Sequence, residues 1–393
     1  MTSSYGLTRL VLTDFRNYGS AQLTCDVRPV ILTGPNGAGK TNILEAISFL
    51  SPGRGLRRAK LSEVTRNNEE SKKPEKEQNS SLSWAWGIAS TLSTPQGSWD
   101  IGTGLEIQEG KERRIVKIGG EILKSQTLLR DYVHVLWVTP QMDRLFQEGA
   151  ATRRRFLDRL VYGLDSMHVT RVTRYEHYMR ERSRLLKYGG ADRHWFDALE
   201  ARMSAEGVAI SAARRQFIDH LLQAKAWTLG TFPQAELALA GQIESWLGAY
   251  SALETEEKFR EVLKASRQQD RESGGVACGP HRSDFTVTYR EKNRAAAFCS
   301  TGEQKALLIS IVFAAARLQN LQGAGVPLML LDEIVAHFDE RRRAALFEEI
   351  LSLKMQAWMT GTDIGLFTSF NNKVQYFRVE NAMVHEKSVL IKM

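Results

Sequence analysis

The sequence predicts an α/β protein in which a phosphate-binding domain is interrupted by a mostly helical lobe. Three observations lead to this prediction. A glycine-rich loop near residue 34 lies between an apolar strand and a helix, an apolar strand near residue 328 ends in two acids, and the segment 141–275 has helical periodicity. We therefore expect the two halves of the phosphate-binding domain at 1–140 and 276–393, with the helical lobe between them.

Composition limits the classes of protein that fit. The chain has 393 residues, 42% of them hydrophobic and 25% charged, as in an ordinary globular protein. No apolar stretch is as long as a membrane span, and the first residues lack a signal-peptide pattern, so we expect a cytoplasmic protein with no membrane partner. Cys25, Cys278 and Cys299 have no metal-like spacing and are expected to be reduced thiols. The net charge of +8 favours a polyanionic partner, nucleic acid first.

The first strands surround the segment Phe15 to Tyr18, and the apolar run Val30 to Leu32 leads into the glycine-rich loop. This loop has the spacing G-x-x-x-x-G-K-[ST] and consists of Gly34, Pro35, Asn36, Gly37, Ala38, Gly39, Lys40 and Thr41, with Asn42 next in the chain. Glycines let successive N–H groups turn toward an anion. Lys40 can then reach the β- and γ-phosphates of a nucleotide, and the Thr41 hydroxyl can hold Mg²⁺. The alternative, a glycine turn that binds nothing, does not explain the strand before the loop and the helix after it.

Two further regions complete the N-terminal half. Residues 67–81 are rich in Asn, Glu, Lys and Ser and are expected to form a solvated loop or an insertion. Alternation from Trp84 to Ile118 predicts antiparallel strands, and Val133 to Val138 predicts a buried strand.

The helical lobe is rich in arginine, and its function is open from the sequence alone. Acids such as Asp158 and Glu176 alternate with the arginines, so a salt-bridged helical face and a basic arm that contacts DNA phosphates are both compatible with the pattern. The arginines in question are 153, 154, 155, 159, 171, 174, 180, 182, 184 and 193.

The C-terminal half returns to alternating strands and helices. Phe285 to Tyr289 predicts a strand, Glu303 to Leu318 a helix that is apolar nearly all round, and Val326 to Leu331 a central parallel strand. Asp332 and Glu333 follow that strand directly. Beside a phosphate-binding loop, Asp332 is expected to hold Mg²⁺ and Glu333 to act as a general base on water, although such a pair also occurs by chance. The region 346–353 predicts another helix and 357–360 another strand.

The segment Ser300-Thr301-Gly302-Glu303 opens the buried helix and resembles the signature of ABC-type ATPases. In that superfamily the signature faces the γ-phosphate held by a second subunit, which assigns Ser300, Gly302 and Glu303 to nucleotide binding across a dimer. The alternative is an ordinary serine cap at a helix start.

Taken together, these residues resemble the RecF family of DNA replication and repair proteins over nearly the whole chain. Besides the motifs above, the likeness is carried by residues 10–18, 53–57, 139–140, 153–158, 279–284 and 336–340. The resemblance implies an ABC-type ATPase head with a helical lobe, ATP and Mg²⁺ as cofactors, and an ATP-dependent homodimer. It also implies low-specificity DNA binding dominated by phosphate contacts, a role in recombinational repair and replication, and recombination-mediator proteins as partners.

The same resemblance implies roles for four more residues. Arg16 and Asn17 are expected near the nucleotide, Asp339 at the partner subunit, and Gln141 near Mg²⁺. The family pattern is not followed everywhere: Glu303 stands where Gln is usual, Ser283 replaces an acid, and Glu333 replaces an Asp that many members have. Where transporter-type ABC ATPases carry a switch histidine, this chain reads Trp358-Met359-Thr360-Gly361-Thr362, which resembles the T-x-T of the family. A threonine is no strong base at neutral pH, so we expect slow, DNA-stimulated hydrolysis with Lys40 and Glu333 as the catalytic residues.

Three other functions predict features that the chain lacks or shows only weakly. A transporter subunit would need the switch histidine, and an SMC-like organiser would need long heptad arms. A nuclease would need a further acidic metal cluster; His281 is the one exception that we considered, and a structural histidine is the preferred interpretation.

Overall fold

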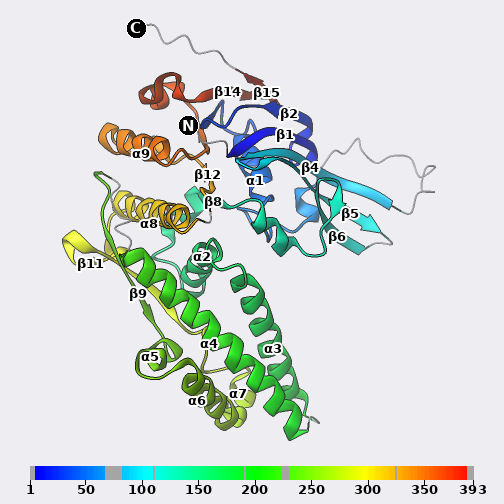
Figure 1. Cartoon of the computed structure of the whole chain (residues 1–393), viewed down its shortest axis with the longest axis vertical. Helices are drawn as coiled ribbons and strands as arrows, with labels where there is room; N and C mark the ends of the chain where they lie inside the picture. Colours follow the sequence, from blue (N-terminus) through cyan, green and yellow to red (C-terminus); the bar gives the residue numbers. More distant parts are fainter. Residues whose placement is uncertain are drawn as a thin grey trace. The chain divides into compact units, whose positions relative to one another are not determined.

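The structure, a computed structural model, describes residues 5–66, 82–108, 111–189, 192–223, 230–323 and 325–386. The chain forms two compact units (Figure 1). The first comprises Met1–Met142, Leu229–Thr231 and Gly325–Met393, and the second comprises Asp143–Thr228 and Phe232–Ala324. The polar segment 67–81 lies outside the described residues.

A mostly parallel sheet in the first unit carries the glycine-rich loop. Its strand order is β15-β14-β3-β13-β12-β8, and only β15 is antiparallel to its neighbour. The strands β3, β12 and β13 are fully buried, as their apolar sequences require. Because β13 lies between β3 and β12, the carboxyl ends of all three meet at one edge. The bounds are β3 (Val30–Thr33), β8 (Val135–Val138), β12 (Leu328–Leu331), β13 (Ala357–Gly361), β14 (Gln375–Glu380) and β15 (Met383–Glu386).

A second, antiparallel sheet in this unit has the order β2-β1-β4-β5-β6-β7, which confirms the antiparallel strands predicted between Trp84 and Ile118. A common hydrophobic core packs residues of both sheets, including Leu10, Trp86, Leu32 and Trp358. The bounds are β1 (Gly6–Phe15), β2 (Tyr18–Thr24), β4 (Leu82–Thr94), β5 (Gly97–Gln108), β6 (Lys111–Ile118) and β7 (Glu121–Ile122).

Gln356 joins the two sheets by hydrogen bonds. Its buried side-chain amide accepts from the Leu7 N–H at 2.7 Å and donates to the Leu7 carbonyl at 2.8 Å, so it pairs with β1 as a neighbouring strand would. It also donates to the Asp26 carbonyl at 2.8 Å. The Gln356 amide thereby satisfies buried backbone groups that have no strand partner at this point.

Helices complete the first unit. These are α1 (Lys40–Ser48) and α9 (Glu340–Ser352), with the 3₁₀ segments η1 (Ser62–Val64), η4 (Gln126–Asp131), η5 (Pro140–Arg144, which continues into the second unit), η8 (Val335–His337) and η9 (Ile364–Lys373). Among the helices of the described residues, none combines the length and the apolar character that a membrane span requires.

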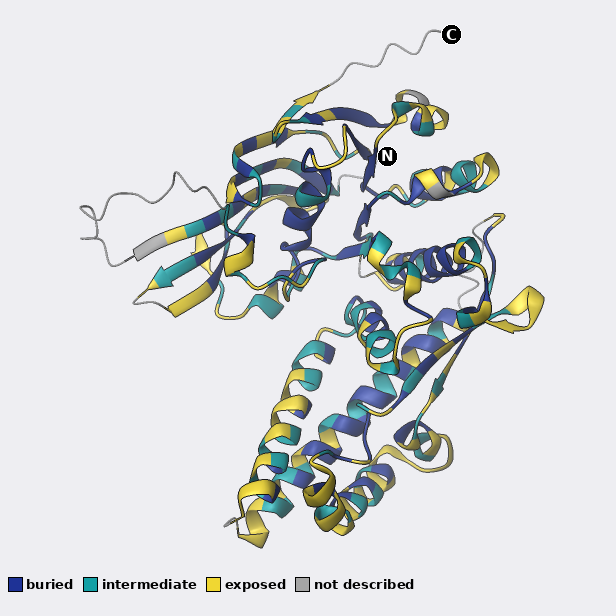
Figure 2. Cartoon of the chain, turned by 180° about the vertical axis from the view of Figure 1, so that it is seen from behind, coloured by how far each residue is buried: buried dark blue, intermediate teal, exposed yellow. Residues whose placement is uncertain are grey.

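The second unit is mostly helical and contains a small antiparallel sheet of order β11-β10-β9. Its helix α8 is buried nearly all round, as its sequence predicts, whereas α3 has an exposed side (Figure 2). The bounds are α2 (Ala150–Tyr162), α3 (His168–Tyr188), α4 (Arg193–Gln223), β9 (Ala235–Ala240), α5 (Gln242–Ala249), α6 (Ala252–Ala265), α7 (Arg267–Ser273), β10 (Asp284–Tyr289), η6 (Arg290–Lys292), β11 (Arg294–Ala295), η7 (Ala296–Phe298) and α8 (Thr301–Leu321).

The division of the chain differs in one respect from the three segments expected. The expected boundary at residue 140 lies close to the one after Met142, but the expected boundary at 275 falls inside the second unit. The reason is that β9, from before residue 275, pairs in antiparallel register with β10, from after it. The helix α8, with the signature at its start, therefore belongs to the helical unit.

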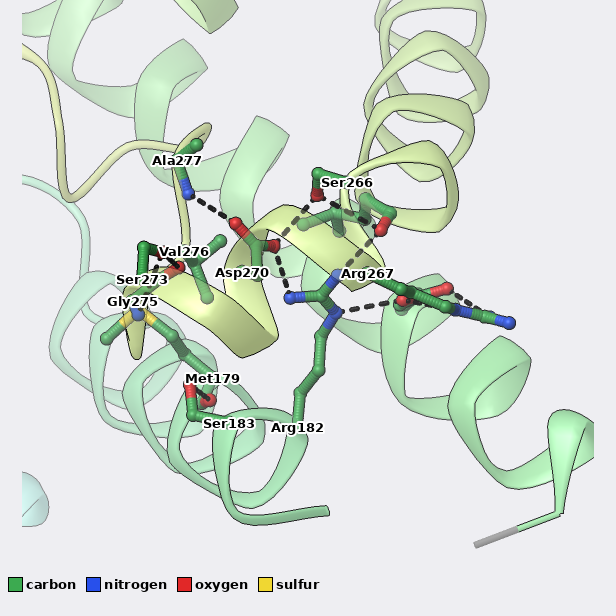
Figure 3. A network of polar contacts seen from close by, with 12 residues as sticks. Met179, Arg182, Ser183, Ser266, Arg267, Asp270, Ser273, Gly275, Val276 and Ala277 are labelled. Carbon is green, nitrogen blue, oxygen red and sulfur yellow. Dashed lines mark hydrogen bonds and ion pairs between the residues drawn. The ribbon is translucent and has the colours of Figure 1, made fainter. Parts of the chain in front are cut away.

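A buried ion-pair network joins four helices of the second unit (Figure 3). Arg182 on α3 is fully buried and donates to Glu200 on α4 at 2.8 Å and to Asp270 on α7 at 2.7 Å. It also donates to the Leu263 carbonyl of α6 at 2.6 Å. Arg267 shares Glu200, so both carboxylates are neutralised and satisfied, which is the condition for burying such charges.

Several other arginines of the lobe also pair with acids. Arg153 binds Asp284 at 2.7 Å, and Arg171 binds Asp165. For these residues and Arg182, the structure shows the salt-bridged alternative. Within the described residues, the exposed Arg180 and Arg184 make long ion pairs of 3.8 and 3.9 Å.

Replacing Arg182 by methionine is expected to lower the free energy of unfolding by about 3–5 kcal/mol, because it leaves the buried carboxylate of Asp270 without its cation and removes one of the two cations of Glu200. Urea denaturation followed by far-UV circular dichroism measures this loss. The control is Arg184→Met on the same helix, 70% exposed, for which we expect a loss of less than about 1 kcal/mol. Equal effects of the two substitutions would contradict the structural role of the network.

Candidate nucleotide-binding site

The glycine-rich loop connects β3 to α1 and has a backbone that only glycine adopts without strain. Gly34, Gly37 and Gly39 have φ values of 152°, 80° and 112°. At Gly39 an added Cβ would lie 2.5 Å from the Tyr18 hydroxyl and 2.6 Å from the Asn17 amide nitrogen. Within the described residues no side chain caps the first turn of α1, and the start of a helix presents N–H groups that can bind an anion.

The side chain of Lys40 is buried against the loop. Its ammonium donates to the carbonyl oxygens of Gly34 at 2.7 Å and Pro35 at 2.8 Å, and the residue is only 5% exposed. Burial lowers the pKa of Lys40, and the nearby carboxylates of Glu333 and Asp332 oppose that shift. Lys40 is thus held at the loop by two hydrogen bonds to carbonyl oxygens, which phosphate oxygens can replace.

The buried carboxylate of Asp332, directly after β12, is shared by two threonine hydroxyls. Thr41 donates to its Oδ1 at 2.9 Å and to its Oδ2 at 3.1 Å, and Thr360 donates to Oδ1 at 2.8 Å. A hydroxyl and a carboxylate in contact are the oxygen ligands that Mg²⁺ takes in P-loop enzymes. Two of the three expected metal residues, Thr41 and Asp332, 291 positions apart, are therefore brought together by the strand order.

Glu333 lies just beyond the strand end and is half-buried. Its φ of 52° is left-handed, which is strained for a residue with a side chain. Its N–H donates to the Thr360 hydroxyl at 2.8 Å. The Glu333 carboxylate lies near enough to Lys40 to oppose the lowering of the pKa of that lysine, which places it beside the phosphate-binding loop, where a general base would be needed.

A polar network supports the loop from the side of α1. Asn17 donates to the Ala38 carbonyl at 3.2 Å and accepts from Asn42 at 2.7 Å. Arg57 donates to Asn42 at 2.6 Å and to Glu45 at 2.9 Å. Asn17 and Asn42 therefore contact or brace the loop, as their assignment to this region requires.

Arg16 contacts the same network. It donates to both oxygens of the fully buried Glu45, at 2.8 and 2.6 Å, and to the Glu63 carbonyl at 2.8 Å. The contacts of Arg16 are thus with α1 and its neighbours. The sequence reasoning missed Glu45 and Arg57 as supports of the loop; the available signal was an acid among the apolar positions of the helix.

Tyr18 was also missed. Its hydroxyl is buried beside Gly39 and has no hydrogen-bond partner within the part of the chain that the structure describes. Burial raises the pKa of Tyr18, so the phenol stays protonated and can donate. With the glycine cradle, the lysine and the Thr41–Asp332 pair, the residues present fit a nucleotide phosphate and its metal.

The signature residues open α8 in the second unit. Ser300 is the N-cap: its hydroxyl accepts from the Glu303 N–H, and the Glu303 carboxylate accepts from the Ser300 N–H at 2.8 Å. Lys292 also binds this carboxylate and, with Ser300, holds the pKa of Glu303 at about 2. Ser300 is exposed, and an added Cβ at Gly302 would meet open space.

The remaining predicted residues lie as follows. Asp339 is the exposed N-cap of α9 and accepts from the Arg342 N–H at 2.8 Å. Gln141 is exposed and follows the carboxyl end of β8, next to β12. Both ring nitrogens of His281 are bonded, to Tyr175 at 2.7 Å and to the Val276 carbonyl at 2.9 Å, as expected for a structural histidine.

Comparison with known proteins identifies the family. The model of the RecF/RecN/SMC N terminal domain matches residues 6–385. The DNA replication and repair protein RecF of Mesorhizobium japonicum is 44% identical over 98% of this chain and 98% of its own length. That of Brucella suis biovar 1 is 46% identical over 95% of this chain and 94% of its own length.

A solved structure of the recombination mediator protein RecF-ATPrS in the RecFOR pathway has a TM-score of 0.81 and 19% identity, and the match covers 98% of this chain and 99% of that one. At this identity the match shows the fold, an ABC-type ATPase head with a helical lobe. The family match and the curated relatives show that the chain belongs to the RecF family of DNA replication and repair proteins.

Proposed function

We propose that the protein is an ATP-dependent, DNA-binding switch of recombinational DNA repair and replication. The observation that carries this proposal is the joined site of Lys40, Thr41 and Asp332, with Glu333 beside it, in a chain 44% identical to a RecF protein over nearly its whole length. The same identity favours this function over an SMC-like or transporter-type subunit.

Each residue of the site has a separate proposed role. The loop N–H groups and Lys40 bind the phosphates, and Lys40 exchanges its contacts with the Gly34 and Pro35 carbonyls for phosphate oxygens. Thr41 and Asp332 hold Mg²⁺, with Gln141 as a further candidate. The metal neutralises charge on the phosphates. Glu333 accepts a proton from the attacking water.

The exposed start of α8, which carries the signature residues Ser300 and Gly302, supports dimerisation by ATP. These residues are called the signature corner. Ser300 and Gly302 are accessible and lie at the start of a long, buried helix, so a second copy can present its bound triphosphate to them. Asp339, exposed at the start of α9, is the proposed contact of the D-loop type. Two nucleotides between two heads then hold the dimer together, and loss of the γ-phosphate contacts releases it.

The proposed DNA contacts are phosphate-dominated and salt-sensitive, because the net charge of +8 supplies attraction without base recognition. The solved relative is described as a recombination mediator in the RecFOR pathway, and proteins of that kind are the proposed partners.

Hydrolysis is expected to be slow, because Thr360, whose hydroxyl donates its proton to Asp332, replaces a histidine that could act as a base. We expect purified protein without DNA to turn over well below the enzyme median of about 10 per second, and gapped DNA to stimulate it. A phosphate-release assay with and without DNA measures both. Turnover above that median in the absence of DNA would contradict the proposed switch.

Lys40→Ala is expected to abolish ATP-dependent dimers, because the loop loses the cation that binds the phosphates. Size-exclusion chromatography with light scattering, with ATP, ADP or no nucleotide, measures the oligomeric state. The control is Lys60→Ala, an exposed lysine of the same unit. Normal dimers of Lys40→Ala with ATP would show that the loop does not control assembly.

Ser300→Arg is expected to leave ATP binding intact and to prevent dimerisation, because a bulky cation fills the corner that receives the partner's nucleotide. The matched control is Ser251→Arg, which removes an equivalent capping box at α6 of the same unit. Fluorescent-nucleotide binding and light scattering separate the two effects. If Ser300→Arg dimerises like wild type, the corner does not act across the subunits.

A further inference from the structure

Thr360 lies at the carboxyl end of β13, between the loop strand β3 and the acid-bearing strand β12. It is 1% exposed, and its hydroxyl bonds to both of the acidic residues that follow β12. The distances are 2.8 Å to the Asp332 Oδ1 and 2.8 Å to the Glu333 nitrogen.

The chemistry of the three groups determines the direction of each bond. A carboxylate only accepts and a backbone N–H only donates, so the Thr360 proton goes to Asp332 and a Thr360 lone pair receives the Glu333 N–H. We propose that Thr360 is a positioning residue for ATP hydrolysis, whose hydroxyl ties the metal-binding carboxylate to the backbone of the general base. The inference rests on the proposed function of the site.

Two features of the turn after β12 explain why it needs the hydrogen bonds of Thr360. Glu333 has a left-handed backbone, with φ at 52°, a conformation that persists only where its surroundings hold it. The N–H of the preceding Asp332 donates to the Val138 carbonyl of β8 at 3.0 Å. Hydrogen bonds thus hold the turn to β8 on one side and to β13 on the other, and Thr360 makes the bond to β13.

The tie also bears on the metal site. Asp332 Oδ1 accepts from Thr41 as well as from Thr360. If Thr41 turns toward a metal, Asp332 loses that partner, and Thr360 remains to keep its orientation. A chain of hydroxyl and carboxylate contacts therefore runs from the metal-binding threonine to the peptide of the general base.

The test is Thr360→Val, which keeps the shape of the side chain and removes both bonds, beside Thr360→Ser, which keeps the hydroxyl. We expect Thr360→Val to lower kcat roughly 10- to 100-fold with little change in the KM for ATP, the effect of a misplaced reacting group. The serine variant is expected to recover most of the rate. Thermal melting reports whether each variant is folded.

A double-mutant cycle separates positioning from a structural role. If Thr360 acts through Glu333, Thr360→Val in a Glu333→Gln background causes little further loss of kcat. The matched control is Thr103→Val, because buried Thr103 in β5 also donates once, to the Ile115 carbonyl, and accepts once, from Arg114. We expect it to lower the melting temperature and to leave kcat and KM unchanged.

Wild-type kcat in folded Thr360→Val, a change in KM alone, or a full additional loss in the Glu333→Gln background would each overturn the positioning role. Failure of Thr360→Ser to recover the rate would also overturn it. If wild-type protein neither binds nor hydrolyses ATP, the proposed function fails first, and that outcome is distinguishable because it does not depend on residue 360.

Discussion

The nucleotide site depends on one buried carboxylate that receives hydrogen bonds from two strands' ends. Asp332 accepts from Thr41, on the helix after β3, and from Thr360, at the end of β13. An acid that is 5% exposed would be costly to bury without such partners. These bonds bring the phosphate-binding loop, the metal residues and Glu333 to one edge of the sheet.

Each unit also contains a buried acid that is satisfied by arginines. Glu45 lies beneath the loop helix and is held by Arg16 and Arg57, while Glu200 in the helical unit is held by Arg182 and Arg267. In both places the charges are paired and fully hydrogen-bonded, which orients helices rather than adding much net stability. Each such pair cancels in the net charge of +8, so the charge that attracts a polyanion comes from basic residues outside these pairs.

The two halves of the proposed composite pocket lie in different compact units. The loop with its metal residues belongs to the first unit, and the signature corner at Ser300 belongs to the second, where Glu303 and Lys292 bond to each other. In the proposed switch, the state of the protein would depend on whether a triphosphate is present between two copies, and the rate of hydrolysis would set how long that state lasts.

The fold class and most elements follow from local sequence. The loop spacing, the apolar runs of β3 and β12 and the all-round apolar pattern of α8 are local features, and they predicted the strands, the helix and the residues Lys40, Thr41, Asp332 and Glu333. The unit boundary and the supporting residues could not be predicted in this way. Pairing of β9 with β10 moved α8 into the helical unit, and Tyr18, Glu45 and Arg57 lie apart from the motifs they support.

By itself, therefore, the sequence determined which residues are the candidates for phosphate and metal chemistry, because motif spacing and hydrophobic period are properties of neighbouring residues. Only the tertiary structure decided how they are held. The strand order β3-β13-β12 brings both Thr41 and Thr360 to the carboxylate of Asp332. Thr41 lies 291 positions from Asp332, so packing that no local pattern records makes this contact.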